Sequence, residues 1–266
     1  MPRIHLIEIH EQPWFPSSIR DEITGALQFG LNLLHAYGPI VPLLQKVIDF
    51  TDSESIVDLC SGGGGPWFDL ARRIHSPKNN GEASDLQVWL TDKYPNHGVR
   101  QNLDAGSPNL ITFHPGAVDA MKVPDELKGL RTMFTSFHHF SPDEARAVLQ
   151  NAVDSGEGVA IFEITRRAVS AIAMVYLWVL LLIVCTPWIR PFHWSRLFWT
   201  FVVPVIPFVL LFDGTVSCLR SYRPAELREI AGQLSGRAYD WEMGEQRTGR
   251  VPVTYLIGRP RASPSG

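Results

Sequence analysis

The sequence has few cysteines, and they form no pattern. Cys60, Cys185 and Cys218 are far apart and have unlike neighbours. Three cysteines at such spacings offer neither the pairs of a disulfide-stabilised domain nor the ligand spacing of a zinc site. We therefore expect a reducing compartment and no metal site.

The chain also lacks an excess of positive charge. Its net charge is −3 and its pI is about 6.3. Nucleic-acid binding needs clustered Lys and Arg to contact phosphates, so we expect no nucleic acid as partner. Residues 1–12 mix charged and apolar side chains and contain no continuous apolar core of a signal peptide. We expect the catalytic part to be cytoplasmic.

Charge is nearly missing from residues 168–212, which carry only two arginines. Residues 168–189 are uncharged throughout, and 22 residues of helix at about 1.5 Å each would cross roughly 30 Å of hydrocarbon. Residues 197–212 form a second apolar stretch, interrupted by Pro204 and Pro207. The pattern predicts an inserted hydrophobic helical hairpin that associates with a membrane.

How this hairpin would meet the membrane stays open at the level of sequence. Its tryptophans fit interfacial anchoring, but arginines occur both in the connecting loop and in the flanks, so the positive-inside rule favours no orientation. A two-pass hairpin and a monotopic or re-entrant one are equally consistent with the sequence. A buried helical pair or an oligomer interface is the alternative, although it would leave a large apolar patch to cover. The oligomeric state is not predicted.

A glycine-rich loop is the strongest motif of the chain. Residues 56–67 read as an apolar strand, four consecutive glycines and the start of a helix. Glycine tolerates positive φ and has no Cβ, so a ligand can lie against the backbone of such a loop. The helix that follows directs unpaired N–H groups at the ligand. Many strand-to-helix turns contain glycine without a ligand, so the loop alone does not decide the matter.

Further motifs follow in order along the chain. A second apolar strand, residues 87–91, ends in Asp92, an acid placed to bind ribose hydroxyls. It comes about ten residues later than is usual after such glycines, which a longer polar loop at 76–85 explains. Residues 116–120 follow a third short apolar run, and residues 132–137 form a fourth before two histidines.

This arrangement resembles the class I S-adenosylmethionine (SAM)-dependent methyltransferases. The resemblance covers residues 56–164 and 213–260. It implies an α/β fold, a Rossmann-like sheet of seven strands with helices on both faces, and SAM as cofactor. Strands at 158–164, 239–245 and 253–257 and a helix at 224–231 complete the expected fold.

The resemblance also implies roles for single residues. The methionine part of the cofactor would contact Asp58, Cys60, Gly62 and Gly64. The ribose would contact Asp92, and the adenine would lie beside Asp119 and Ala120. Each acid also has a structural interpretation. Asp58 could cap the following loop, Asp92 could be a solvated strand end, and Asp119 could be a helix N-cap or a turn residue.

Methyl transfer depends mainly on alignment of the nucleophile, with a base needed only when the acceptor carries a proton. His138 and His139 follow the fourth strand and are candidate bases, and Glu163 at the end of the fifth strand is a candidate for orienting the acceptor. A structural turn against the cofactor is the other interpretation of the histidine pair. Candidate substrate residues lie outside this region: Trp14, Asp213, Arg220 and Tyr222.

Domain boundaries follow from these motifs. We expect a helical lid at residues 1–50, whose aromatic side chains could equally be ordinary packing residues. The core at 51–167 resumes at 213–260 around the insertion at 168–212, and residues 261–266 form a tail. The insertion follows the fifth strand, at the sheet edge where ligands bind in open α/β folds.

The sequence therefore predicts a SAM-dependent methyltransferase that acts on a hydrophobic, membrane-soluble or lipid-like small molecule. A membrane-tethered module that binds SAM without turnover is the alternative. A nicotinamide-dependent oxidoreductase is disfavoured, because the glycine spacing does not match and no Tyr-x-x-x-Lys pair is present.

Overall fold

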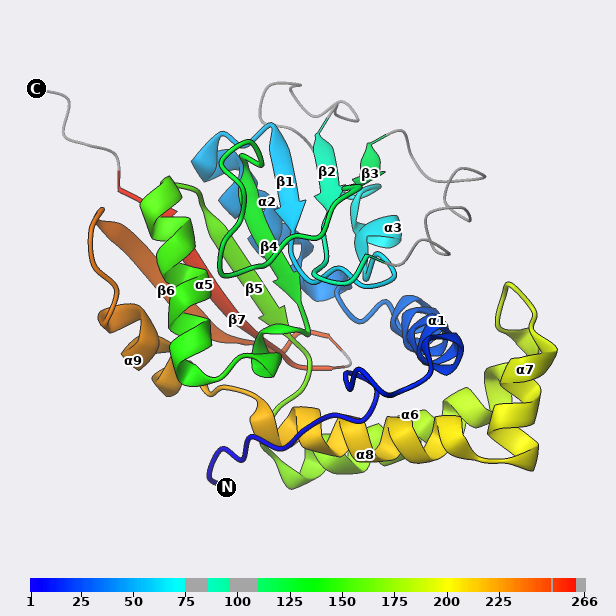
Figure 1. Cartoon of the computed structure of the whole chain (residues 1–266). Coiled ribbons are helices and arrows are strands. Elements are labelled where there is room, and N and C mark those ends of the chain that lie inside the picture. Colours follow the sequence, from blue (N-terminus) through cyan, green and yellow to red (C-terminus); the bar gives the residue numbers. More distant parts are fainter. Residues whose placement is uncertain (75–85, 96–109, 250, 262–266) are drawn as a thin grey trace, which may run out of the picture. The chain divides into compact units, whose positions relative to one another are not determined.

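The computed structural model describes residues 1–74, 86–95, 110–249 and 251–261 (Figure 1). The polar stretch at 76–85, predicted to be a loop, and most of the predicted tail lie outside the described residues. The chain forms two compact units, each built from segments that are distant in sequence. Unit 1 comprises Met1–Leu34 and Thr165–Arg223, and unit 2 comprises His35–Ile164 and Pro224–Gly266.

Unit 2 contains a seven-stranded mixed sheet in the order β3-β2-β1-β4-β5-β7-β6. Five strands are parallel, namely β1 (Ser55–Asp58), β2 (Gln87–Leu90), β3 (Ile111–Phe113), β4 (Leu130–Phe134) and β5 (Val159–Glu163). The last two, β6 (Tyr239–Gln246) and β7 (Val253–Pro260), form an antiparallel pair, and β7 also pairs antiparallel with β5. The predicted seven-stranded α/β fold is confirmed.

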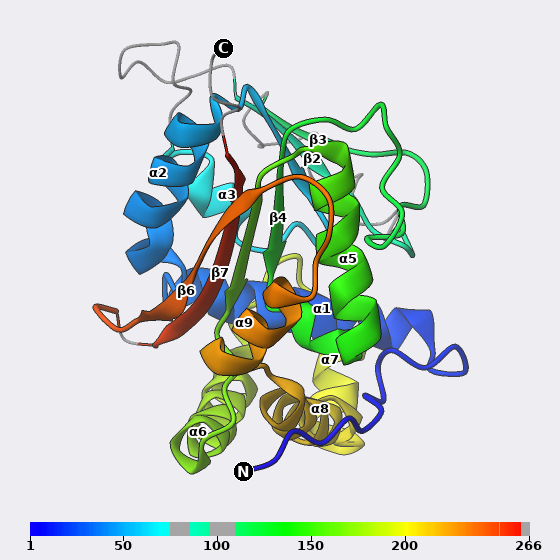
Figure 2. The same cartoon turned by 90° about the vertical axis from the view of Figure 1, so that its left-hand side faces the viewer.

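Helices cover both faces of this sheet (Figure 2). One face carries α2 (Val41–Thr51) and α3 (Trp67–Leu70), and the other carries α5 (Pro142–Ser155) and α9 (Pro224–Gly232). Central strands β4 and β5 are buried along nearly their whole length, as expected for parallel strands covered on both sides. The α5 helix starts at a capping box formed by Ser141 and Glu144 and ends at Gly156, whose φ of 72° allows the left-handed cap.

The fourth strand is shorter than the sequence pattern predicts. It ends at Phe134, and Phe137–His139 form a 3-10 turn instead of continuing the strand. The Glu163 carboxylate stabilises this turn, since its Oε1 accepts hydrogen bonds from the backbone N–H groups of Phe137 at 2.6 Å and His138 at 3.3 Å. The turn therefore depends on a side chain from the neighbouring strand, which periodicity cannot reveal.

Unit 1 contains the predicted helical hairpin. Its arms are α6 (Val169–Cys185) and α8 (Val205–Arg220), joined through the short helix α7 (Trp194–Leu197) and a π-helical turn, Phe198–Val202. The arms approach closely, because a Cβ on Gly214 would lie 2.6 Å from Val175. The second arm extends eight residues beyond the predicted end at residue 212.

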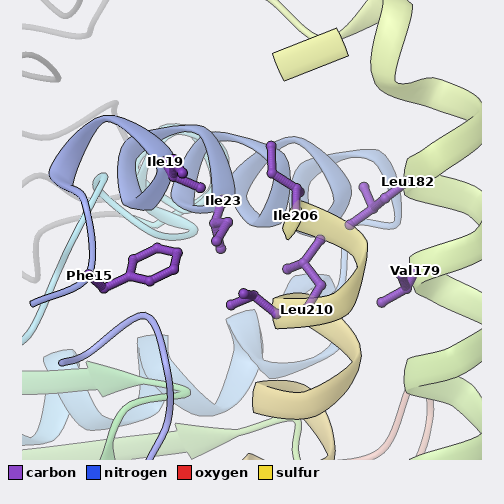
Figure 3. Packing of buried hydrophobic residues seen from close by; sticks show 8 residues of the cluster. Phe15, Ile19, Ile23, Val179, Leu182, Ile206 and Leu210 are labelled. Atoms are coloured by element: carbon purple, nitrogen blue, oxygen red, sulfur yellow. The ribbon is translucent and has the colours of Figure 1, made fainter. Parts of the chain in front are cut away.

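Helix α1 (Ser17–Leu33) crosses the hairpin and buries its apolar side against it (Figure 3). Their shared core consists of Phe15, Ile19, Ile23, Val179, Leu182, Ile206, Val209 and Leu210. Gly30 is required at the crossing, since a Cβ there would lie 2.5 Å from the Trp178 ring. This hydrophobic cluster joins the two segments that form unit 1.

Charged contacts join the two segments of unit 1 as well. The buried Glu22 carboxylate accepts hydrogen bonds from Arg196 Nε at 2.7 Å, Ser195 Oγ at 2.8 Å and His193 Nδ1 at 2.7 Å. Arg196 also donates to the backbone oxygens of Ile189 and Pro191. We call Glu22, His193, Ser195 and Arg196 the tip cluster. These contacts attach the segment that connects the two arms to α1.

Among the described residues, one helical stretch is long and apolar enough to cross a membrane. It is Val169–Trp188, with a mean hydropathy of 2.5, and only 17% of its most apolar window is buried. A second pair of helices, Trp194–Val202 and Val205–Arg220, passes the same test jointly but is bent by 75°. A core helix of a soluble protein also passes such a test, so membrane association is not settled by composition.

Candidate functional site

The candidate cofactor site lies at the carboxyl ends of β1 and β2 in unit 2. After β1 the chain turns sharply, with positive φ at Cys60 (56°), Gly62 (53°), Gly64 (98°) and Gly65 (51°). A Cβ on Gly64 would lie 2.6 Å from the Phe68 ring, so Gly64 is required by packing within the loop. By contrast, a Cβ on Gly62 would meet nothing within 4 Å. Gly62 therefore faces open space that a ligand could occupy.

Asp92 connects this loop to the second strand. Its Oδ2 accepts the Gly62 N–H at 2.9 Å, and its Oδ1 accepts the Tyr94 N–H at 2.8 Å. Burial raises the pKa of Asp92, and these backbone hydrogen bonds partly offset that effect. A carboxylate has about four acceptor positions, so two further hydrogen bonds from a vicinal diol fit the same group.

The turn that contains Asp119 and Ala120 lies beside the end of β2. The Val118 N–H donates to the Asp92 backbone oxygen at 2.9 Å, which aligns the 118–120 turn with the end of β2. Ala120 is buried. The Asp119 carboxylate accepts hydrogen bonds from the Lys93 ammonium and from the Met121 N–H, both at 2.9 Å. Burial acts to raise the pKa of Asp119, but these bonds outweigh it and the pKa is lowered. Lys93 was not singled out from the sequence.

Asp58 is buried at the end of β1. Its Oδ1 accepts the Thr132 hydroxyl of β4 at 2.6 Å. Burial is the main cause that raises the pKa of Asp58 to about 6. A nearby cation would stabilise the charged carboxylate, so Asp58 suits contact with a positively charged ligand.

The pKa of Asp58 has a consequence for stability. Because the folded pKa lies above the usual value near 4, the folded chain binds more protons than the unfolded chain between pH 4 and 6. The free energy of unfolding should therefore fall as pH rises across this window, by roughly 2–3 kcal/mol from Asp58. Urea unfolding of Asp58→Asn and of the unmodified chain at pH 4 to 7 measures it. Parallel pH profiles for the two proteins would contradict the assignment.

A histidine–glutamate pair lies at the ends of β4 and β5. His138 Nδ1 is 2.8 Å from Glu163 Oε2, and both side chains are buried. Burial acts to raise the pKa of Glu163, yet the charge and hydrogen bond of His138 outweigh it and the pKa is lowered. An ionised carboxylate only accepts hydrogen bonds, so Nδ1 carries a proton in this pair, and in the neutral form of the ring Nε2 is the basic nitrogen. The His139 ring lies 4.2 Å from that of His138.

Two residues of this region were missed at the level of sequence. The Tyr37 hydroxyl hydrogen-bonds to Thr135 Oγ1, just past β4, where Thr135 adopts a φ of 47°. The ring of Tyr37 packs edge-on against Phe134 at 5.0 Å, and burial raises the pKa of Tyr37. Nothing in the local sequence around Tyr37 indicates a partner 98 residues away.

The four predicted substrate residues all belong to unit 1. Asp213 accepts the backbone N–H groups of Ile9 and His10 as well as His10 Nδ1. Arg220 is paired with Glu11 at 3.1 Å and with Glu8 at 3.5 Å. The Tyr222 ring lies under the Arg3 guanidinium, and Trp14 is 69% exposed. Asp213 and Arg220 thus join α8 to the N-terminal segment, and their role in substrate binding stays a prediction.

Comparisons with known proteins bear on the fold. No family model matches the sequence, and no curated protein matches it. Among solved structures, a SAM-dependent methyltransferase from Aquifex aeolicus matches with a TM-score of 0.50 at 13% identity, over 91% of this chain and 98% of that one. The chain has the fold of the SAM-dependent methyltransferases. The predicted resemblance is confirmed at this level.

A second structure agrees. An O-methyltransferase from neocarzinostatin biosynthesis, in complex with S-adenosyl-L-homocysteine and 1,4-dihydroxy-2-naphthoic acid, matches with a TM-score of 0.50 at 16% identity. This match covers 90% of the present chain but 57% of the other. Human N-acetylserotonin methyltransferase, in complex with SAM, is covered to 56%, at 13% identity and a TM-score of 0.48. The chain thus spans little more than half the length of these two proteins.

Proposed function

We propose that this protein is a SAM-dependent methyltransferase whose acceptor is a hydrophobic, membrane-soluble or lipid-like small molecule. The observation that carries the proposal is the Asp92–Gly62 contact, which joins a ligand-accessible glycine turn to an acid at the end of the next strand. The fold shared with methyltransferases supports it. The similar O-methyltransferase from neocarzinostatin biosynthesis carries 1,4-dihydroxy-2-naphthoic acid in its crystal, which favours a small acceptor here.

The residues fit SAM in charge and shape. Gly62 leaves room beside the backbone, Asp92 has free acceptor positions for a ribose diol, and Asp58 is an acid that gains from a nearby cation. Bound SAM supplies an electrophilic methyl carbon on a positively charged sulfur. Asp119 and Ala120 would border the adenine, with Lys93 holding the Asp119 carboxylate.

The chain's own part in the reaction is to orient the acceptor and, where needed, to remove its proton. We propose that His138 Nε2 removes the proton of the acceptor. Glu163 holds the proton of the neutral ring on Nδ1, so Nε2 is left to act as the base. Glu163 acts through the histidine and is a positioning residue. His139 and the 3-10 turn border the same strand ends.

A hydrophobic acceptor is supported by the exposed apolar surface of unit 1. Large apolar side chains of α6 are exposed, such as Leu177 at 60% and Leu180 at 61%. Such a surface is unfavourable in water and favours contact with a membrane, the source of a lipid-like acceptor. Incubating membrane extracts with methyl-labelled SAM and the protein should yield a labelled lipid-soluble product. SAM binding without any labelled product in several extracts would favour the non-catalytic module instead.

Asp92→Ala tests the cofactor site directly. Loss of a charged acceptor for two ribose hydroxyls should weaken SAM binding roughly 10²- to 10⁴-fold, since hydrogen bonds to charged groups contribute about 1.5–3 kcal/mol each. Isothermal titration calorimetry measures the affinity. Asp69→Ala is the matched control, because Asp69 is an acid of α3 that pairs with Arg73 on the surface. Unchanged affinity of Asp92→Ala, or binding of a nicotinamide nucleotide instead, would overturn the assignment.

A further inference from the structure

The exposed face of the hairpin is a continuous apolar stripe. Leu177, Leu180 and Val184 of α6 and Trp188 of the 3-10 turn that follows it have helical spacing, with 60 to 66% of each exposed. The opposite side of the same helix holds Val179 and Leu182, which belong to the core shared with α8 and α1. An amphipathic helix in water presents polar residues on its exposed side. Here both sides are apolar, so the outer side must be covered by something other than water.

The second arm and the connection continue this apolar surface. Phe208 and Phe212 of α8 are stacked and exposed at 61% and 39%, and Phe201 of the π-helical turn is exposed at 54%. Figure 3 shows Ile206 and Leu210 of α8 and Val179 and Leu182 of α6 directed into the core that the two arms share with α1. The exposed side chains therefore lie on the sides of both arms that α1 does not cover. We call this surface the outer face.

The composition of the outer face fits a lipid surface. No acidic residue occurs between Glu163 and Asp213, whereas Arg190 is exposed at the tip. Trp188 and Trp194 flank this arginine and are exposed at 66% and 78%. Tryptophan prefers the boundary between hydrocarbon and water, and arginine favours anionic head groups. A surface whose only charges are positive is complementary to an anionic membrane. It would repel a second copy of the same surface.

The second arm is too short to cross a bilayer. Its apolar part, from Val205 to Phe212, is eight residues long, or roughly 12 Å at 1.5 Å per residue, against about 30 Å of hydrocarbon. Asp213 follows at once and is fixed by three hydrogen bonds to residues 9 and 10. The 75° bend before Val205 removes the possibility of a straight continuation into the preceding helix.

Helix α1 also opposes a spanning arrangement. It packs on the half of the hairpin that lies next to the connection between the arms, and its Glu22 binds Arg196 in that connection. If the hairpin stood upright across the bilayer, α1 would lie at the depth of the hydrocarbon or beyond it. That position would carry the exposed Asp21 and the partly exposed Arg20 into or through the membrane, which is costly.

We infer that the hairpin lies in the plane of one leaflet, with its outer face in contact with the lipid and α1 on the side facing the cytosol. The tip of the hairpin then stays on the same side of the membrane as α1, held there by Glu22 and Arg196. This inference rests on the proposed membrane association and deepens it by assigning a one-leaflet, non-spanning arrangement.

Accessibility of the tip from the two sides of a membrane tests the arrangement. The full chain, with its three native cysteines changed to serine, would carry either Arg190→Cys at the tip or Asp21→Cys on α1. Inverted vesicles, with the cytosolic face outside, and intact spheroplasts would be treated with a membrane-impermeant maleimide. We expect both cysteines to be labelled in inverted vesicles and neither in spheroplasts. Labelling of the tip in spheroplasts alone would show that the hairpin crosses the membrane and would overturn the inference.

The lipid contact itself has a separate test. Flotation of the purified chain with vesicles of phosphatidylcholine and phosphatidylglycerol should show binding, and Leu180→Glu with Val184→Glu should reduce the bound fraction at least tenfold. Leu33→Glu is the matched control, because Leu33 is 47% exposed on α1, outside the outer face. A protein that stays unbound and forms dimers through this surface would contradict the inference. SAM affinity, measured on the same samples, shows separately whether the proposed enzyme function survives.

Discussion

Replacing His138 by alanine is expected to lower the turnover number about 10²- to 10⁴-fold for an acceptor that must lose a proton at neutral pH. The expectation follows from the buried pair in which Glu163 Oε2 lies 2.8 Å from His138 Nδ1, with Nε2 as the proposed base. Affinity for SAM should change little, since the cofactor contacts are assigned to other residues. Initial rates with the labelled acceptor, at saturating SAM, measure the effect.

Two controls separate a base from a structural histidine. Glu163→Gln preserves the shape of the pair but removes the charge that fixes the histidine proton, so turnover should fall and its pH profile should shift. His139→Ala removes the adjacent ring without touching the pair. If His138→Ala retains full turnover, the pair is a structural turn, as the alternative sequence interpretation holds.

The second large effect concerns stability. Glu22→Ala should lower the free energy of unfolding of unit 1 by about 3–5 kcal/mol, because it leaves the buried Arg196 guanidinium without its carboxylate. Urea unfolding in detergent, followed by circular dichroism, measures the change. Asp21→Ala, the exposed neighbour, should alter stability by no more than about 0.5 kcal/mol.

A paired substitution sharpens this test. Glu22→Leu combined with Arg196→Met removes both charges, and apolar replacements of a whole buried pair are often tolerated. The double variant should therefore be more stable than Glu22→Ala alone. Equal losses in the single and double variants would mean that the ion pair is not what fixes the tip of the hairpin.

The sequence was sufficient for the features that depend on neighbouring residues. The glycine turn and Asp92 at the end of a strand both follow from local backbone preferences and periodicity. The fold could be predicted because these motifs occur in a fixed order. The two apolar arms were visible from composition alone.

What could not be predicted depends on contacts between distant segments. Asp213 and Arg220 follow an apolar stretch and therefore suggested a site for a polar head group. In the structure they are engaged by residues 8–11, about 200 positions earlier. The same limit applies to the Tyr37–Thr135 hydrogen bond and to the Glu163 carboxylate that ends the fourth strand. Side-chain partners of this kind leave no periodic signal.

The discontinuous build of unit 1 has a consequence for synthesis on the ribosome. Its first segment ends at Leu34, and its second begins only at Thr165. At about 5–20 residues per second, translation of the intervening chain takes on the order of 10 s. During that delay Ile19 and Ile23 lack the hairpin side chains they pack against in the finished protein. Helix α1 can therefore reach its final packing only after the hairpin has been synthesised.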